Sequence, residues 1–191
     1  MNLILASQSP RRRELLGLFG LPFTVRVADI DETMAPGAAP YDEVARVSHQ
    51  KALAVPREED DVVIAADTIV VCEGKILGKP KDAGEAKAML HLLSGRAHQV
   101  MTGMCVLRGD TAVVVTEVTD LQFRTLSDKE IDAYIATGEP MDKAGAYGIQ
   151  GGAALFCPRM VGDYYNVMGL PVCRLGEILK QVAPEWMGET L

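Results

Sequence analysis

Short apolar runs alternate with amphipathic stretches along this 191-residue chain, a pattern typical of an α/β fold. Residues 62–66 are continuously apolar, as in a strand that is buried on both faces of a sheet. Shorter strands are expected over residues 3–6 and 23–27, and the β-rich runs 98–107 and 111–123 are expected to form a hairpin. The sequence therefore predicts a sheet whose strands are separated by helices.

The segments between these runs carry helix start and stop signals. Ser9 suits an N-cap position, and Gly20 suits the end of the helix that follows. Further helices are predicted over residues 41–55, 82–95, 127–137 and 170–182. Residues 138–152 are glycine-rich and irregular, and the runs 153–160 and 163–167 are expected to pair as a final hairpin.

Length and composition limit which kinds of protein this chain can be. No repeat or low-complexity linker divides the chain, so one domain over residues 1–191 is expected, with two small lobes and a loose tail after about residue 184. A net charge of −7 argues against bulk attraction to nucleic acid or to an anionic membrane surface. No apolar run approaches the ~18 residues of a membrane span, and a cytoplasmic protein is expected. The four cysteines are scattered without a CxxC pair, so zinc is not expected.

A basic turn follows the first predicted strand, beginning at Ser7. Arg11, Arg12 and Arg13 fall in the first turn of a helix, where each positive charge opposes the helix dipole by roughly 0.3–1 kcal/mol. That cost is offset if the turn binds an anion such as phosphate, and Arg11 and Arg12 are expected to do so while Arg13 turns away. The alternative is a solvated basic turn, and the P-loop pattern is absent.

Carboxylates stand at two further places. Asp67 follows the apolar run, where it could hold Mg²⁺, act as a general base on water, or do both. The alternative for Asp67 is a carboxylate that caps a nearby turn. Asp29, Asp31 and Glu32 form an acidic loop that could bind a hard cation or could simply be solvated.

Two lysines and a glycine-rich segment complete the candidates. Lys51 falls on a predicted helix, and Pro80 stiffens the turn that holds Lys79. Residues 142–152 include four glycines, which allow a ligand to approach the backbone closely. The amide of Gln150 can donate and accept, as reading a base edge requires. The alternatives are ordinary surface lysines and a flexible loop.

Taken together and in this order, these segments resemble the Maf family of nucleoside triphosphate pyrophosphatases. The resemblance is carried by LASQSPRRRELL from Leu5, ADTIV from Ala66, GKP from Gly78, LSG from Leu93, HQVMTG from His98 and DKAGAYGIQG from Asp142. Each stretch alone is weak evidence, whereas the ordered set is specific. The last stretch looks like the branch that acts on dTTP and UTP, and a sister branch that acts on 7-methyl-GTP differs in this loop.

The resemblance implies an elongated Maf/ITPase-like α/β fold, with a twisted mixed central sheet flanked by helices and a cleft between two lobes. It implies hydrolysis of the α–β phosphoanhydride of dTTP and UTP, with Mg²⁺ or Mn²⁺ as cofactor and commonly a homodimer. Such an enzyme would remove non-standard or excess nucleotides. The alternatives are a 7-methyl-GTP pyrophosphatase, a non-catalytic nucleotide-binding regulator of septum formation, and a protein-interaction module that docks an acidic partner on its arginine turn.

The resemblance also implies roles for individual residues. The proton acceptor of the family falls on Asp67, and the metal ligands fall on Glu32 and Asp67. Contacts to the phosphates or the metal fall on Ser7, Arg11, Arg12, Glu32, Lys51 and Lys79. Substrate specificity falls on Arg11, Thr68 and Gln150.

Overall fold

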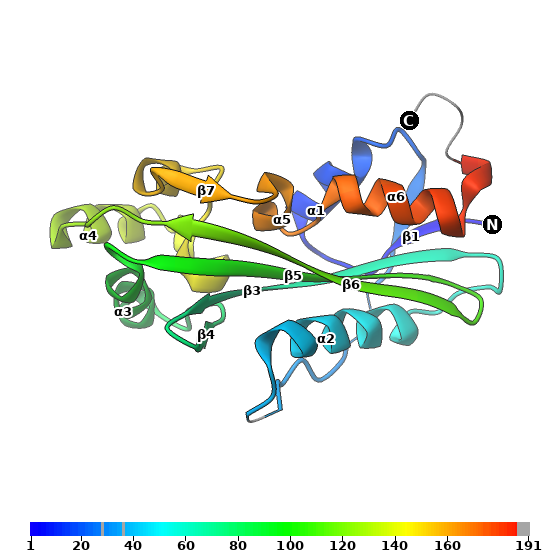
Figure 1. Cartoon of the computed structure of the whole chain (residues 1–191), viewed down its shortest axis with the longest axis horizontal. Helices are drawn as coiled ribbons and strands as arrows, with labels where there is room; N and C mark the ends of the chain where they lie inside the picture. The colour runs from blue at the N-terminus through cyan, green and yellow to red at the C-terminus, as the bar shows by residue number, and fades with distance from the viewer. Residues whose placement is uncertain (28, 36, 187–191) are drawn as a thin grey trace. The chain divides into compact units, whose positions relative to one another are not determined.

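The structure is a computed structural model that describes residues 1–27, 29–35 and 37–186. It contains a mixed sheet of seven strands in the order β2-β1-β3-β5-β6-β7, with β4 paired to β3 (Figure 1). The strands are β1 Leu3–Leu5, β2 Phe23–Val25, β3 Val62–Cys72, β4 Lys75–Leu77, β5 Ala97–Arg108, β6 Thr111–Gln122 and β7 Arg159–Val161. The prediction of an α/β fold with a mixed sheet and flanking helices is confirmed.

The described helices lie between and after these strands. They are α1 Pro10–Gly17, α2 Pro40–Ala54, α3 Ala83–Leu93, α4 Asp128–Ala136, α5 Tyr164–Met168 and α6 Val172–Val182. Short 3₁₀ segments occupy Glu139–Asp142, Ala144–Ala146, Gly152–Phe156 and Pro184–Trp186. Among the described residues, no helix combines the length and the apolar character that a membrane span requires.

The chain divides into two compact units. The first unit comprises Met1–Asp67, Thr102–Glu117 and Gly169–Leu191, and the second comprises Thr68–Met101 and Val118–Met168. The expectation of a single domain stays a prediction, and each unit is described below by itself.

In the first unit, β1 is the central parallel strand. Leu3 lies opposite Phe23 of β2 and Val62 of β3, so this register places three apolar runs side by side. Figure 1 shows α2 on one face of this part of the sheet and α6 on the other. The buried side chains between α2 and the sheet are Ile4, Ala6, Ala52, Val55, Val63, Ala65, Cys105 and Leu107.

Gly103 determines how closely α2 approaches β5. A Cβ atom built on Gly103 would overlap the carbonyl group of Val44 and would lie 2.7 Å from the amide nitrogen of Ala45. The main chain of α2 therefore lies directly on β5 at this point, which only glycine permits. Gly103 belongs to the HQVMTG stretch, and its role in the first unit is packing.

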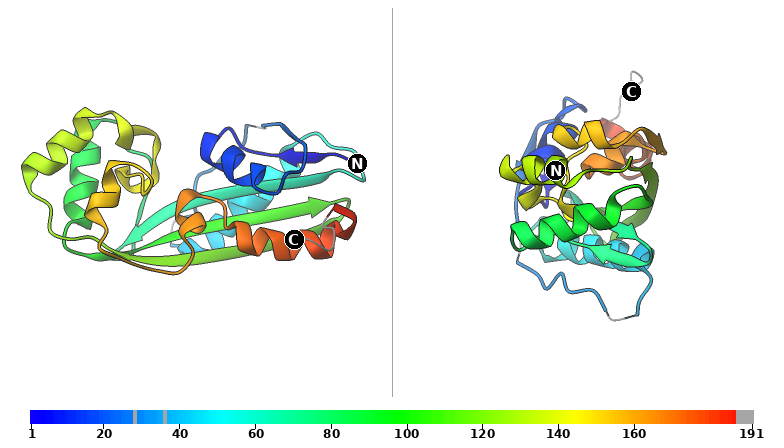
Figure 2. Two further views of the ribbon diagram at one scale, coloured as in Figure 1. Left: turned by 90° about the horizontal axis from the view of Figure 1, so that it is seen from above. Right: turned by 90° about the vertical axis from the view of Figure 1, so that its left-hand side faces the viewer.

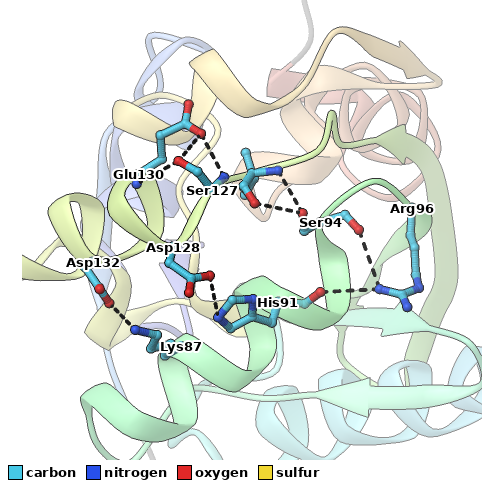
Figure 3. A network of polar contacts seen from close by, with 9 residues as sticks. Lys87, His91, Ser94, Arg96, Ser127, Asp128, Glu130 and Asp132 are labelled. Carbon is cyan, nitrogen blue, oxygen red and sulfur yellow. Dashed lines mark hydrogen bonds and ion pairs between the residues drawn. The ribbon is translucent and has the colours of Figure 1, made fainter.

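In the second unit, α3, α4 and the 3₁₀ segments Glu139–Asp142 and Ala144–Ala146 lie together (Figure 2). Polar contacts tie α3 to α4 and to the segment before it (Figure 3): Lys87 pairs with Asp132 at 2.6 Å, and the amide of Leu126 donates to Ser94 Oγ at 2.8 Å. The helix predicted over residues 127–137 is present as α4, and Ser127 caps it in a capping box that Glu130 closes. These contacts fix α4, which matters for the segment that follows it.

The buried aromatic cluster of the second unit contains His98. Its ring is 3% exposed, its Nε2 lies 2.9 Å from Tyr147 Oη, and it packs edge-on against Phe123. Burial lowers the pKa of His98 from 6.5 to about 4, although the nearby backbone of Arg96 acts in the opposite direction. The hydrogen bond between His98 and Tyr147 ties strand β5 to the glycine-rich segment that contains Tyr147.

This burial predicts a loss of stability in mild acid. Between pH 6.5 and 4 the unfolded chain binds a proton at His98 that the folded chain does not, so the free energy of unfolding falls as the pH falls. From pH 7 to pH 5 we expect His98 to contribute a loss of roughly 2 kcal/mol. Urea unfolding at both pH values tests this: His98→Gln should show a weaker dependence on pH than the wild type. Equal pH dependence in wild type and His98→Gln would contradict the assignment.

Three expectations about helices and strands need correction or completion. The strand predicted over residues 62–66 extends to Cys72, so Asp67 lies inside β3 and not at its end. Residues 163–167 form no strand, because α5 begins at Tyr164 and β7 pairs with β6 instead. The helix predicted over residues 82–95 begins at an Asp82 cap, where Asp82 Oδ1 accepts from the amide of Glu85, but Glu85 accepts from the amide of Lys81, so a capping box is not completed.

The chain end departs in part from the expected loose tail. Pro184–Trp186 forms a 3₁₀ turn, and Glu185 pairs with Arg108 at 2.8 Å. The rest of the predicted tail, residues 187–191, lies outside the described residues.

Candidate active site

Hydrogen bonds to the hydroxyl groups of two serines stabilise the turn between β1 and α1. Ser9 caps α1 by accepting from the amide of Arg12 at 3.4 Å, and Ser7 Oγ accepts from the amide of Ser9 at 3.2 Å. Arg12 Nη1 donates to the same Ser7 Oγ at 3.2 Å, and Arg12 Nε donates to the carbonyl of Gly169 at 2.7 Å. Ser7 is buried, so these bonds fix its hydroxyl group next to a guanidinium.

The three arginines separate as expected, because Arg11 and Arg12 are partly buried and Arg13 is exposed. The pKa of Arg12 lies below its usual value, chiefly because burial removes water from the guanidinium and partly because Arg11 is close. The negative charges of Asp67 and Glu32 oppose this shift. Arg12 therefore shares one electrostatic environment with both carboxylates that sequence reasoning singled out.

Lys51 joins these two carboxylates directly. Lys51 Nζ lies 2.7 Å from Asp67 Oδ1 and 3.0 Å from Glu32 Oε2. Lys51 and Asp67 are 14% and 13% exposed, whereas Glu32 is 57% exposed. The structure thus brings a helix, a strand and a loop together at the ammonium group of Lys51. The ion pair with Lys51 fixes the direction of the Asp67 carboxylate.

The acidic loop is held in place by a pair of side chains on α2. Glu43 is buried and forms a bidentate pair with Arg46. Glu43 Oε2 also accepts from the amide of Ala35 at 2.7 Å, and Arg46 Nη2 donates to the carbonyl of Thr33 at 3.0 Å. The pKa of Glu43 is lowered, first by the hydrogen bond from Arg46 and then by the Ala35 amide. The backbone just after Glu32 is therefore fixed by two side chains that sequence reasoning did not identify.

The remaining predicted residues lie in the second unit. Thr68 follows Asp67 in β3 and is partly buried, whereas Lys79 and Gln150 are exposed. The amide of Gly145 donates to the carbonyl of Gly78 at 3.0 Å, which ties the turn with Lys79 to the segment that leads to Gln150. These residues stay predictions as ligand contacts.

The donor set of the first unit can be tested against a divalent cation. Glu32 and Asp67 present two carboxylate oxygens to the same ammonium group, so cation-binding oxygens already converge at this point. Within the described part of the chain, no group of three or more acidic, histidine or cysteine side chains could hold a metal ion. Two carboxylates completed by phosphate oxygens are a usual set for Mg²⁺, which seldom uses an all-protein cage. The residues present fit a cation that is held jointly with a phosphate ligand.

Tyr134 and Glu139 are a second pair that sequence reasoning missed. Tyr134 Oη donates to Glu139 Oε1 at 2.9 Å, and both side chains bond the glycine-rich segment around Gln150. The i,i+3 spacing of Glu43 and Arg46 is a signal for an ion pair on a helix, but no sequence signal marks the contact of either pair with a loop.

The chain matches a known family and its relatives over most of its length. The sequence model of a family described as Maf-like protein matches residues 2–182. A protein of Bacillus cytotoxicus named dTTP/UTP pyrophosphatase is 51% identical over 179 residues, which covers 93% of this chain and 94% of the relative. A protein of Bacillus cereus with the same name is 50% identical over 181 residues, covering 94% of this chain and 95% of the relative.

A solved structure is similar in fold at much lower identity. The structure of a HAM1 protein from Coxiella burnetii matches with a TM-score of 0.52 at 13% identity, covering 95% of this chain and 99% of that one. At that identity the likeness concerns the fold alone.

Proposed function

Because the chain belongs to the Maf family, we propose that it hydrolyses the α–β phosphoanhydride of dTTP and UTP, releasing the nucleoside monophosphate and pyrophosphate. One observation carries the proposal: Lys51 binds Glu32 and Asp67 together, next to the arginine turn, in a chain half identical to relatives named dTTP/UTP pyrophosphatase. Pool cleansing, a homodimer and a cytoplasmic location accompany the proposal as predictions from the sequence.

The basic residues of the first unit bind the phosphates. Arg11, Arg12 and Lys51 supply positive charge in a protein whose net charge is −7, so the triphosphate meets a local cationic site. Ser7 contributes a hydroxyl group that Arg12 holds in place. Lys79, in the second unit, is assigned to the phosphates as well.

Asp67 is the general base. Lys51 engages Oδ1 at 2.7 Å and so orients the carboxylate, and Oδ2 takes the proton of the attacking water. As the water oxygen bonds to a phosphorus of the α–β anhydride and the bridging P–O bond breaks to release pyrophosphate, Lys51 and the arginines stabilise the negative charge that develops on the phosphate oxygens.

Glu32 and Asp67 would hold a divalent cation, Mg²⁺ or Mn²⁺, which when bound supplies Lewis-acid polarisation of a phosphate oxygen. The cation shares these carboxylates with Lys51, so its binding depends on the position of the loop that contains Glu32. Thr68 and Gln150 are assigned to the pyrimidine, with Arg11 as a third specificity position.

A panel of nucleotides tests the proposal. Purified protein with Mg²⁺ or Mn²⁺ should release pyrophosphate from dTTP and UTP, and a nucleotide at 100 times its Kd should stabilise the fold by ~2.7 kcal/mol. Release from 7-methyl-GTP alone would assign the sister activity. Tight binding without any release would support a nucleotide-binding regulator, and neither binding nor release would support a protein-interaction module.

The buried pair on α2 gives a prediction about the cation. Glu43→Gln removes one carboxylate oxygen from the network that fixes Ala35 and Thr33, so the loop with Glu32 is less well placed. We expect the Mg²⁺ concentration for half-maximal activity to rise by about tenfold, as when groups that support metal ligands are changed. Titration of activity with Mg²⁺ at saturating dTTP measures it.

The matched control is Asp42→Asn, which changes an exposed carboxylate one position earlier on α2. Asp42→Asn should leave the Mg²⁺ requirement as in the wild type. An unchanged requirement in Glu43→Gln would mean that the Glu32 loop does not depend on this pair.

A further inference from the structure

Gln150 lies at the tip of a tight turn in the second unit. The amide of Gly151 donates to the carbonyl of Gly148 at 3.1 Å, which closes a turn with Gln150 in its third position. The Gln150 side chain is exposed. Its location therefore depends on what holds the two ends of the turn.

Two side chains bridge these ends. Glu139 Oε2 accepts from the amide of Gly152 at 3.0 Å, and Glu139 Oε1 accepts from the hydroxyl of Tyr134 at 2.9 Å. The same hydroxyl accepts from the amide of Gly148 at 2.9 Å. One carboxylate and one phenol thus connect the backbone before Gln150 to the backbone after it.

Tyr134 is suited to this double role. Its hydroxyl donates to one partner and accepts from the other, which requires the neutral phenol. Burial is the main cause that raises the pKa of Tyr134, Glu139 raises it further, and the Gly148 amide acts in the opposite direction. The ring packs edge-on against Phe156, with 5.2 Å between ring centroids, so the ring is fixed independently of the hydroxyl.

The glycines of the turn are matched to the carboxylate. A Cβ atom on Gly151 would overlap the Glu139 carboxyl group, and a Cβ atom on Gly148 would lie 2.9 Å from Glu139 Oε1. Glu139 fills the space beside both glycines, and the side chain of Lys143 also lies beside Gly148, so a larger residue at either position would displace these side chains. The glycine-rich sequence here therefore reflects a tightly held turn, in contrast to the flexible loop that remained as an alternative.

The two side chains stand on supported backbone. Tyr134 lies on α4, which is capped by Ser127 and tied to α3 (Figure 3). The amide of Glu139 donates to Thr137 Oγ1 at 3.1 Å, and Lys143 Nζ donates to the carbonyl of Glu139 at 2.7 Å. The position of the turn is thereby linked to the helical part of the second unit.

We propose that Glu139 and Tyr134 are positioning residues for base recognition, because they fix the turn of Gly148–Gly151 and so set where the Gln150 amide meets the pyrimidine. The inference rests on the proposed function, in which Gln150 is a specificity residue. It assigns substrate discrimination to residues that need not touch the nucleotide.

Glu139→Gln is the first variant to test. It keeps the size of the side chain but replaces one acceptor oxygen with a donor, so it cannot accept from both the Gly152 amide and the Tyr134 hydroxyl. We expect KM for dTTP and UTP to rise by about tenfold, with kcat little changed. Inorganic tripolyphosphate, which has no base, should inhibit with the same Ki as in the wild type. The control Glu73→Gln changes an exposed carboxylate of the same unit and should alter none of these values.

A double-mutant cycle with Gln150→Ala tests whether Glu139 acts through Gln150. In the Gln150→Ala background, Glu139→Gln should change KM by about twofold or less. A tenfold rise that persists in this background, or an equal rise in the Ki of tripolyphosphate, would overturn the inference. If Glu139→Gln does not fold, Tyr134→Phe removes only the hydroxyl group and carries the same expectations.

The failure of this inference is distinct from the failure of the proposed function. Wild-type protein that hydrolyses dTTP, together with a Glu139→Gln variant of unchanged KM, would overturn the positioning role alone. Wild-type protein that releases no pyrophosphate from any pyrimidine nucleotide would overturn both.

Discussion

Asp67→Asn should lower kcat for dTTP by about 10²–10⁴-fold, the range typical of losing a general base. The asparagine keeps the shape of the side chain and its place in β3, but it cannot accept a proton from water. It also loses the charge that pairs with Lys51 at 2.7 Å. We expect KM to change much less than kcat, because the basic residues that bind the phosphates are all retained. Steady-state kinetics with dTTP at saturating Mg²⁺ would measure both constants.

Asp110→Asn is the matched control, because Asp110 is an exposed aspartate in the turn between β5 and β6. It should have wild-type kinetics. If Asp67→Asn bound nucleotide normally and turned over at the wild-type rate, the proton would have to be accepted elsewhere.

Gly103→Ala should have the largest effect on stability. The added methyl group would overlap the carbonyl of Val44, and backbone atoms cannot rotate away as a flexible side chain can. We expect a loss of about 1–3 kcal/mol or more in the free energy of unfolding, as for overpacked cores. Because α2 also contains Lys51, its displacement should reduce activity in the molecules that remain folded. Urea unfolding and steady-state kinetics at a temperature well below Tm would separate the two effects.

Gly17→Ala provides the comparison for this variant. Gly17 lies in α1, and a Cβ atom there would have no heavy atom within 4 Å beyond its immediate neighbours. Its replacement should leave stability unchanged or raise it by up to about 1 kcal/mol. Equal stability of Gly103→Ala and Gly17→Ala would mean that α2 and β5 can separate without cost.

The fold was predictable wherever one local signal dominated. The continuous apolar run at 62–66 identified β3, and Ser9 and Ser127 identified the starts of α1 and α4. The prediction of a final hairpin was wrong because it relied on the high β propensity of Tyr164 and its neighbours. In the structure, Asp163 Oδ1 accepts from the amide of Tyr165 at 2.7 Å, and a helix begins there. The extension of β3 beyond Asp67 was missed because a charged residue was taken as a strand end.

The site was predictable in its residue types and only partly in its geometry. The resemblance to the Maf family pointed to Lys51 and Asp67, but only the structure shows that they pair across 16 positions of the chain. The supporting pairs, Glu43 with Arg46 and Tyr134 with Glu139, are local, but each bonds a loop from another part of the chain, and sequence spacing does not encode where that loop folds back. Such contacts between distant segments are the part of a site that needs coordinates.

The central claim is that this chain cleaves the α–β phosphoanhydride of a pyrimidine nucleoside triphosphate. Phosphorus NMR of the products from dTTP, with Mg²⁺ present, tests it most directly. We expect equimolar thymidine monophosphate and pyrophosphate from the wild type, with no thymidine diphosphate at any time. Thymidine diphosphate with inorganic phosphate would place the cleavage at the β–γ bond and would contradict the account.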